Sequence, residues 1–131
     1  MTITIGSKRY PDDVWGMMKD RTMGPLFHKF CQTRLAHENT AFLNALAKRT
    51  KLPILYNAFI KPDSQFEINI PGNMRKYMVH MGGVSDWDHA GWKKSLEAAR
   101  VHIVNLLDAN FSVDFWKSEV FRKFIFKETG D

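Results

Sequence analysis

Residues 55–70 read LYNAFIKPDSQFEINI, and the spacing of the apolar residues changes at Pro62. Before this proline, apolar residues recur every three or four positions, which predicts a short helix over 54–60. After it, apolar and polar residues alternate, which predicts a short extended segment. Three side chains would lie on its inner side: Phe66, Ile68 and Ile70. Asn69 would lie on the outer side, where its amide could bind a partner or cap the turn.

Helical spacing predicts further helices on both sides of this block. They cover residues 11–20, 25–36, 37–53, 72–81, 92–109 and 112–127. Asp12 or Asp13 would cap the first of them and Ser112 the last, because Asp and Ser side chains accept hydrogen bonds from the free N–H groups of a first helical turn. No repeat or linker divides the sequence. We therefore expect an all-α fold of several short antiparallel helices in one domain, residues 1–131.

The composition is that of a globular domain, and its positive charge suggests an acidic partner. Hydrophobic residues make up 44% of the 131 residues, which is enough for a buried core. The single cysteine, Cys31, lies on the apolar side of a predicted helix, so we expect it to be buried. A lone cysteine also favours a cytoplasmic protein over a secreted one. The net charge of +5 suggests an anionic membrane surface, nucleic acid or an acidic protein face as partner.

Sequence patterns of catalytic sites are missing. There is no glycine-rich phosphate loop, no HExxH and no pair of cysteines. The stretch SDWDH places Asp86, Asp88 and His89 close together, but such groups in a polar loop are usually solvated. We therefore expect no metal, no cofactor and no catalytic residues. The pattern disfavours an ordinary enzyme.

The carboxyl-terminal stretch 114–127 mixes aromatic and basic residues. Its cations are Lys117, Arg122, Lys123 and Lys127. We interpret the stretch as a helix that packs on the core and has a basic outer face. The alternative is an amphipathic helix that lies on an anionic membrane surface. Binding to nucleic acid is disfavoured, because no recognisable nucleic-acid-binding motif accompanies the pattern.

Three blocks of the sequence, taken in order, resemble the regulator of G-protein signalling (RGS) domain. FHKFCQTRLAHENTAFL, residues 27–43, is similar to a helix pair of that family that contains EEN. Residues 55–70 are similar to its helix and loop that contain EIN, and residues 97–121 to its tail helices. The blocks cover well over half of the chain. The resemblance implies a single domain with a bundle of about nine short helices.

The resemblance also implies a function and a set of contact residues. Family members bind the switch regions of a heterotrimeric G-protein Gα subunit and accelerate its GTP hydrolysis, without catalytic groups of their own. The implied protein is therefore a GTPase activator rather than an enzyme, cytoplasmic and at the inner face of the plasma membrane. The implied Gα contacts that match the family are Glu38, Asn39, Glu67, Asn69 and Leu106. For Glu38 and Asn39 the alternative is a role in starting a helix, and for Leu106 a place in the core.

Three further contact positions depart from the family pattern. Asn110 occupies a position where the family usually has Asp, and its neutral carbonyl accepts a weaker hydrogen bond than a carboxylate. Phe111 replaces a small polar residue, and Asp114 stands where the family usually has Arg. These departures motivate a second hypothesis, an RGS-like scaffold that binds a protein or a membrane without accelerating hydrolysis. In that case Phe111 would belong to an exposed apolar patch.

Overall fold

The computed structural model describes residues 2–130, most of which are helical. One hairpin is formed by β1 (Thr2–Ile5) and β2 (Lys8–Pro11). The helices are α1 (Val14–Lys19), α2 (Met23–Thr33), α3 (His37–Ala47), α4 (Leu52–Leu55), the π-helical turn η1 (Tyr56–Ile60), α5 (Gly72–Gly83), α6 (Gly91–Trp116) and α7 (Glu119–Thr129). The predicted helical character is confirmed. The described residues form seven α-helices and one π-helical turn, so the implied count of nine is not met.

The amino-terminal hairpin is the part of the fold that the all-α prediction missed. β1 and β2 pair antiparallel, with Ile3 opposite Tyr10. Gly6 in the turn has a φ of +63°, a left-handed conformation that glycine adopts without a Cβ clash. An isolated two-stranded hairpin is only marginally stable in water. This one is held on the core, because the ring of Tyr10 packs edge-on against Phe124 of α7 with centroids 5.7 Å apart.

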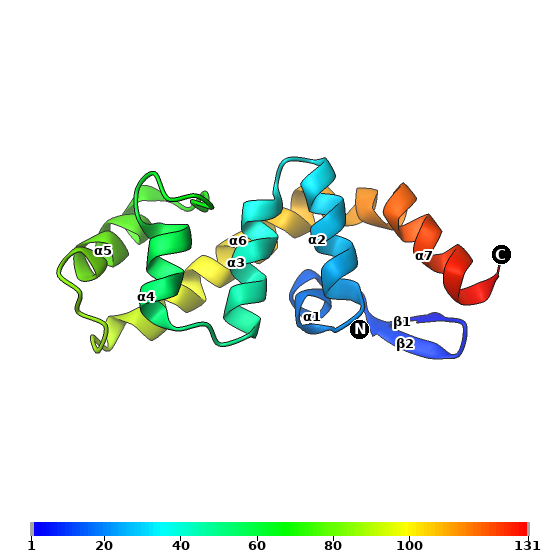
Figure 1. Ribbon diagram of the computed structural model, residues 1–131, viewed down its shortest axis with the longest axis horizontal. Coiled ribbons are helices and arrows are strands. Elements are labelled where there is room, and N and C mark those ends of the chain that lie inside the picture. The colour runs from blue at the N-terminus through cyan, green and yellow to red at the C-terminus, as the bar shows by residue number, and fades with distance from the viewer. Residues whose placement is uncertain (1, 131) are drawn as a thin grey trace.

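Helix α6 runs along the long axis of the molecule and connects its two ends (Figure 1). At one end α4, η1 and α5 pack near its amino-terminal half. At the other end α2, α7 and the hairpin lie near its carboxyl-terminal half, with α1 and α3 between the two groups. Its fully buried side chains recur at multiples of four residues: Ala99, Ile103, Leu107 and Phe115. Because the helix has 3.6 residues per turn, each step of four residues turns this buried stripe by about 40°. The stripe therefore winds around α6, so that different sides of the helix are buried at its two ends.

Aromatic rings fill the core around the carboxyl-terminal half of α6. The ring of Phe115 lies 5.2 Å from Phe27 and 5.7 Å from Phe30, both in α2, and 5.4 Å from Phe121 in α7. The first two pairs meet edge to face, an arrangement that aromatic rings favour. Cys31 is fully buried, as predicted, and burial raises the pKa of its thiol to about 12. The thiol is therefore protonated at neutral pH and a poor nucleophile.

The amino-terminal cap of the last helix lies six residues later than predicted. Helix α6 continues without interruption to Trp116, so Ser112 is a buried residue inside it and not a helix cap. The cap is Ser118, whose backbone is extended and whose Oγ accepts a hydrogen bond from the N–H of Phe121 at 3.2 Å. The prediction for Ser112 was wrong because burial of Phe115 in the aromatic core keeps the chain helical past that residue.

This boundary predicts that two serines contribute differently to the free energy of unfolding. Replacing Ser118 by alanine removes the cap of α7, and we expect a loss of about 1 kcal/mol in the free energy of unfolding. Replacing Ser112 by alanine leaves a helical residue with higher helix propensity, and we expect a change within about 0.5 kcal/mol. Urea unfolding of both variants measures the difference. A larger loss for Ser112→Ala than for Ser118→Ala contradicts the observed boundary.

Candidate functional site

The loop between η1 and α5, residues 61–71, folds back over the end of η1. The last carbonyl groups of a helix have no partner within the helix and need other donors. Here the N–H of Phe66 donates to the carbonyl oxygen of Ala58 at 3.1 Å, and the N–H of Ile68 donates to that of Phe59 at 3.0 Å. The loop thus serves as the cap of the preceding helix. Its path is set by backbone hydrogen bonds rather than by pairing with another strand.

The alternation predicted for this loop is confirmed at residues 68–70, whereas Phe66 and Glu67 are both half-buried. Ile68 and Ile70 are buried, with 1% and 7% of their surface exposed, whereas Asn69 between them is exposed. Within residues 2–130 the Asn69 side chain makes no hydrogen bond, so the structure gives no support to the alternative that it caps the turn. Two buried isoleucines hold the backbone on either side of one outward-facing amide.

Arg75 of α5 fixes the loop from its inner side. Its Nη1 donates to the carbonyl oxygen of Ile60 at 2.8 Å and lies 2.9 Å from Oε2 of Glu67, and its Nη2 donates to the carbonyl oxygen of Ile68. Oε1 of Glu67 accepts a hydrogen bond from the N–H of Asp63 at 2.9 Å. One guanidinium and one carboxylate therefore connect both ends of the loop to α5. Glu67 is thus paired with a residue of this protein. The sequence analysis did not identify Arg75 as part of the site.

The first turn of α3 lies next to this loop. The ring of His37 meets that of Phe66 edge to face, with centroids 6.2 Å apart. Glu38 in the same turn stabilises the positive end of the helix, which has no side-chain cap at Ala36. Asn39 is 4% exposed, and its Nδ2 lies 3.5 Å from Oε1 of Glu38. Asn39, which was predicted to be a direct contact residue, is thus buried beside Glu38.

Three buried side-chain atoms lack a hydrogen-bond partner among the described residues, and all three belong to this region. They are Nδ1 of His37, Oδ1 of Asn39 and Oγ of Ser64. Such atoms are rare in native proteins, because leaving one unpaired costs about 1–3 kcal/mol. Oγ of Ser64 belongs to the loop, and the other two atoms belong to the first turn of α3.

A hydrogen bond between two helices holds the start of α3. Nδ1 of His28 in α2 lies 2.6 Å from Oγ1 of Thr40, which also lies 3.1 Å from the carbonyl oxygen of His37. The Thr40 hydroxyl thereby links α2 to the first turn of α3. Burial lowers the pKa of His28, and the nearby His37 lowers it further. His28 is therefore neutral at pH 7 and acts as a structural link.

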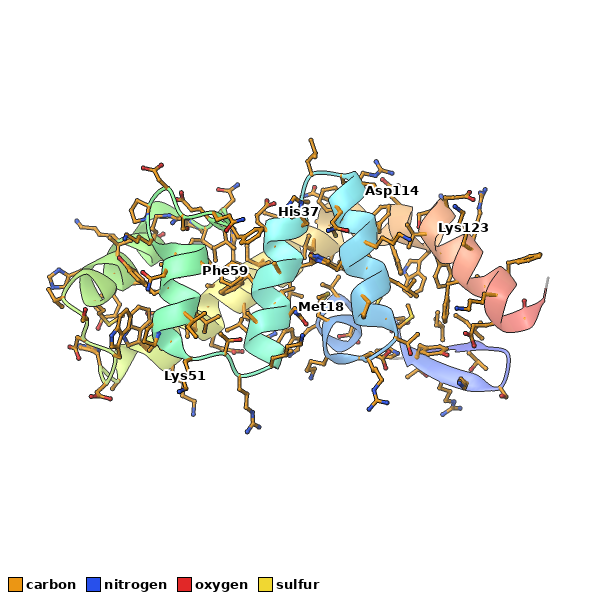
Figure 2. All side chains as sticks on the ribbon, viewed as in Figure 1. Met18, His37, Lys51, Phe59, Asp114 and Lys123 are labelled. Carbon is orange, nitrogen blue, oxygen red and sulfur yellow. The ribbon has the colours of Figure 1, made fainter. Side chains whose placement is uncertain are left out.

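The four contact residues predicted on α6 lie along its carboxyl-terminal half. Leu106 and Phe111 are half-buried and pack against the core, whereas Asn110 and Asp114 are exposed. The expected exposed patch at Phe111 is therefore not found. Oδ2 of Asp114 lies 3.9 Å from Nη2 of Arg34 in the turn between α2 and α3, and both side chains are about half exposed. His37 and Asp114 lie on the same edge of the molecule (Figure 2).

The turn between α2 and α3 contains a residue that the sequence reasoning missed. Leu35 is 84% exposed and has a φ of +56°, a left-handed conformation that is unfavourable for a residue with a branched side chain. The helix predicted over 25–36 included Leu35, because spacing of four residues places it on the same face as Phe27 and Cys31. In the structure α2 ends at Thr33, so Leu35 lies in the turn.

Together these segments form one edge, which we call the candidate surface. It consists of the loop 61–71, the turn 34–36, the first turn of α3 and residues 106–114 of α6. The contact between His37 and Phe66 joins the loop to α3, and the ion pair between Arg34 and Asp114 joins the turn to α6. In the described part of the chain no hydrogen bond or ion pair joins the α6 residues directly to the loop. The loop therefore contacts α3, and α6 contacts the turn that precedes α3.

The candidate surface consists of exposed polar, charged and apolar side chains. Among residues 2–130 no group of three His, Cys, Asp or Glu side chains is placed to hold a metal ion. Over the same residues, no helix combines the length and the apolar character needed to cross a bilayer. What the surface offers is an exposed amide, an exposed leucine and a few charged side chains on a fixed backbone.

Comparison with protein families matches residues 14–124 to the Regulator of G protein signaling domain. Comparison with curated proteins gives no match. The matched range contains the whole candidate surface and leaves out the amino-terminal hairpin and the end of α7. Because it covers most of the 131 residues and includes the loop and helices described above, the chain belongs to the regulator of G protein signaling domain family.

Proposed function

We propose that this protein is a GTPase activator that binds the switch regions of a heterotrimeric G-protein Gα subunit through the candidate surface. Membership of the family supports a regulatory role in G-protein signalling. The observation that carries the finer proposal is the exposed amide of Asn69, held between buried Ile68 and Ile70 on a loop that Arg75 fixes. Gα subunits act at the cytoplasmic face of membranes, so we propose the same location for this protein.

The proposed mechanism needs no acid, base or metal from this chain. A Gα subunit supplies its own arginine and a glutamine that orients the attacking water. A partner that binds the switch segments most tightly in their transition-state conformation lowers the barrier by differential binding. Lowering the barrier by about 2.7 kcal/mol gives roughly a hundredfold acceleration. A rigid surface is what such a mechanism requires, because a mobile loop loses entropy when it binds.

The proposed contacts divide into two roles. Asn69, Glu38, Leu106, Asn110, Phe111 and Asp114 would touch the switch segments, and Leu35 adds an apolar contact. Glu67 and Asn39 would act through their neighbours, since Glu67 is paired with Arg75 and Asn39 is buried behind Glu38. Oδ1 of Asn39 is buried without a partner among the described residues. A small shift of the first turn of α3 would bring this acceptor within reach of a donor on Gα.

We prefer activation to the scaffold hypothesis for two reasons. The scaffold hypothesis rested on an exposed Phe111, which is half-buried against the core. It also rested on the reversed charge at Asp114, and Arg34 lies beside that carboxylate and restores a positive charge at the same edge. The departures from the family pattern are thus partly compensated within the structure.

Single-turnover GTP hydrolysis by a panel of Gα subunits tests the proposal. We expect acceleration of roughly a hundredfold for at least one subunit. The acceleration should disappear with a Gα variant that lacks its own catalytic glutamine, since the chemical groups belong to Gα. Acceleration of none of the subunits would refute the proposal.

Replacing Asn69 by alanine should reduce the acceleration by about five- to tenfold, because an interfacial hydrogen bond of this kind contributes about 1–1.5 kcal/mol. The free energy of unfolding should stay within about 1 kcal/mol of the parent, as for other surface substitutions. Asn105→Ala, at an exposed position of α6 outside the candidate surface, is the matched control and should leave hydrolysis unchanged. A large loss of stability for Asn69→Ala would instead indicate a structural role.

Replacing Leu35 by glycine should separate stability from binding. Glycine removes the strain of the left-handed backbone conformation, which is about 1–2 kcal/mol. It also costs about 0.5–1 kcal/mol, because glycine has more conformational freedom in the unfolded chain. The free energy of unfolding should therefore equal or exceed that of the parent protein. Activation should fall, because the exposed apolar side chain is lost. Ser85→Gly is the matched control, since Ser85 has a φ of +55° in the exposed turn before α6. Equal activity of Leu35→Gly and the parent protein would remove Leu35 from the proposed surface.

A further inference from the structure

Helix α7 has two faces of different character. One face contributes Phe121 and Phe124 to the core, with 6% and 9% of their surface exposed. The other face carries a shallow groove whose lining comes from Glu119, Arg122, Lys123, Ile125 and Phe126. Phe126 is 62% exposed. A large aromatic ring without a polar atom is therefore surrounded by charged side chains at the surface.

Most of the net charge of the protein is concentrated at this end. Residues 2–11 and 117–129 contain six cations and two carboxylates, a net charge of +4 out of +5 for the chain. The cations are Lys8, Arg9, Lys117, Arg122, Lys123 and Lys127. None of them forms an ion pair with a carboxylate in the described part of the chain. The hairpin lies beside α7 in Figure 1, and Figure 2 shows Lys123 on that helix.

We propose that the outer face of α7 docks on an anionic phospholipid surface, with Phe126 entering the boundary between headgroups and acyl chains. Cations on one face of a helix are attracted to anionic headgroups, and an apolar side chain among them gains by leaving water. A nucleic acid would also bind these cations, but a single exposed phenyl ring on a helix would add little to its binding. The combination of Phe126 with unpaired cations therefore favours lipid.

Two features separate this surface from the loop that carries Asn69. The family match ends at residue 124, so Phe126, Lys127 and the hairpin lie outside the matched segment. Helix α7 and the hairpin also lie at the opposite end of the long axis from α4 and α5, between which the loop 61–71 runs (Figure 1). Of the candidate surface, only the turn 34–36 and residues 106–114 of α6 lie toward the α7 end.

Sedimentation with vesicles tests the inference. We expect binding to vesicles of phosphatidylcholine with about 30% phosphatidylserine, little binding to pure phosphatidylcholine, and weaker binding at high salt. Arg122→Glu combined with Lys123→Glu should reduce partitioning by about tenfold or more, and Phe126→Ala by several-fold. The matched control is Lys93→Glu combined with Lys94→Glu, the same charge change at exposed positions of the first turn of α6, and should reduce it by less than about threefold.

A label at position 126 reports insertion directly. Cys31 is buried and its thiol pKa is about 12, so an environment-sensitive fluorophore should attach selectively to the new thiol of Phe126→Cys. The emission should shift to the blue with anionic vesicles, while a label on Val84→Cys, at an exposed turn, should not respond. Equal binding to neutral and anionic vesicles overturns the inference. Anionic binding that is insensitive to Phe126→Ala also overturns it, because that result indicates a general affinity for polyanions such as nucleic acid.

Discussion

The guanidinium of Arg75 is the constraint on which the candidate surface depends. It bridges the carbonyl oxygens of Ile60 and Ile68 and pairs with Glu67, which in turn accepts from the N–H of Asp63. The ends of the loop are thereby tied to one residue of α5. Fixing a backbone residue costs about 1–2 kcal/mol of conformational entropy, so a loop ordered within the domain does not lose that entropy again when it meets a partner.

Contacts within the domain also fix the other segments of the candidate surface. The first turn of α3 is held by His28 and Thr40, and α6 is one continuous helix whose buried face is packed on the aromatic core. The side chain of Asn69 makes no hydrogen bond within the described residues, and Oδ1 of Asn39 is buried without a partner. The proposed contact with Gα would give both groups a role that folding stability does not.

Part of this arrangement could be predicted from the sequence because it follows from local periodicity. The alternation around Asn69 predicted which side chains face inward, and the helical spacing predicted the helical character of the chain. The role of Arg75 could not be predicted, because its partners are backbone carbonyls of another segment. The hairpin and the late break at Ser118 also depend on tertiary packing, in which Tyr10 and Phe115 join an aromatic core that no local pattern reveals.

We propose that the candidate surface is complementary to the switch segments of Gα in their transition-state arrangement. The affinity for one purified Gα subunit can be measured in three states: with GDP, with GDP and aluminium fluoride, and with a non-hydrolysable GTP analogue. We expect binding to be tighter by about tenfold or more in the aluminium fluoride state than in either of the others. Equal affinity in all three states, or no binding in any, would refute this complementarity.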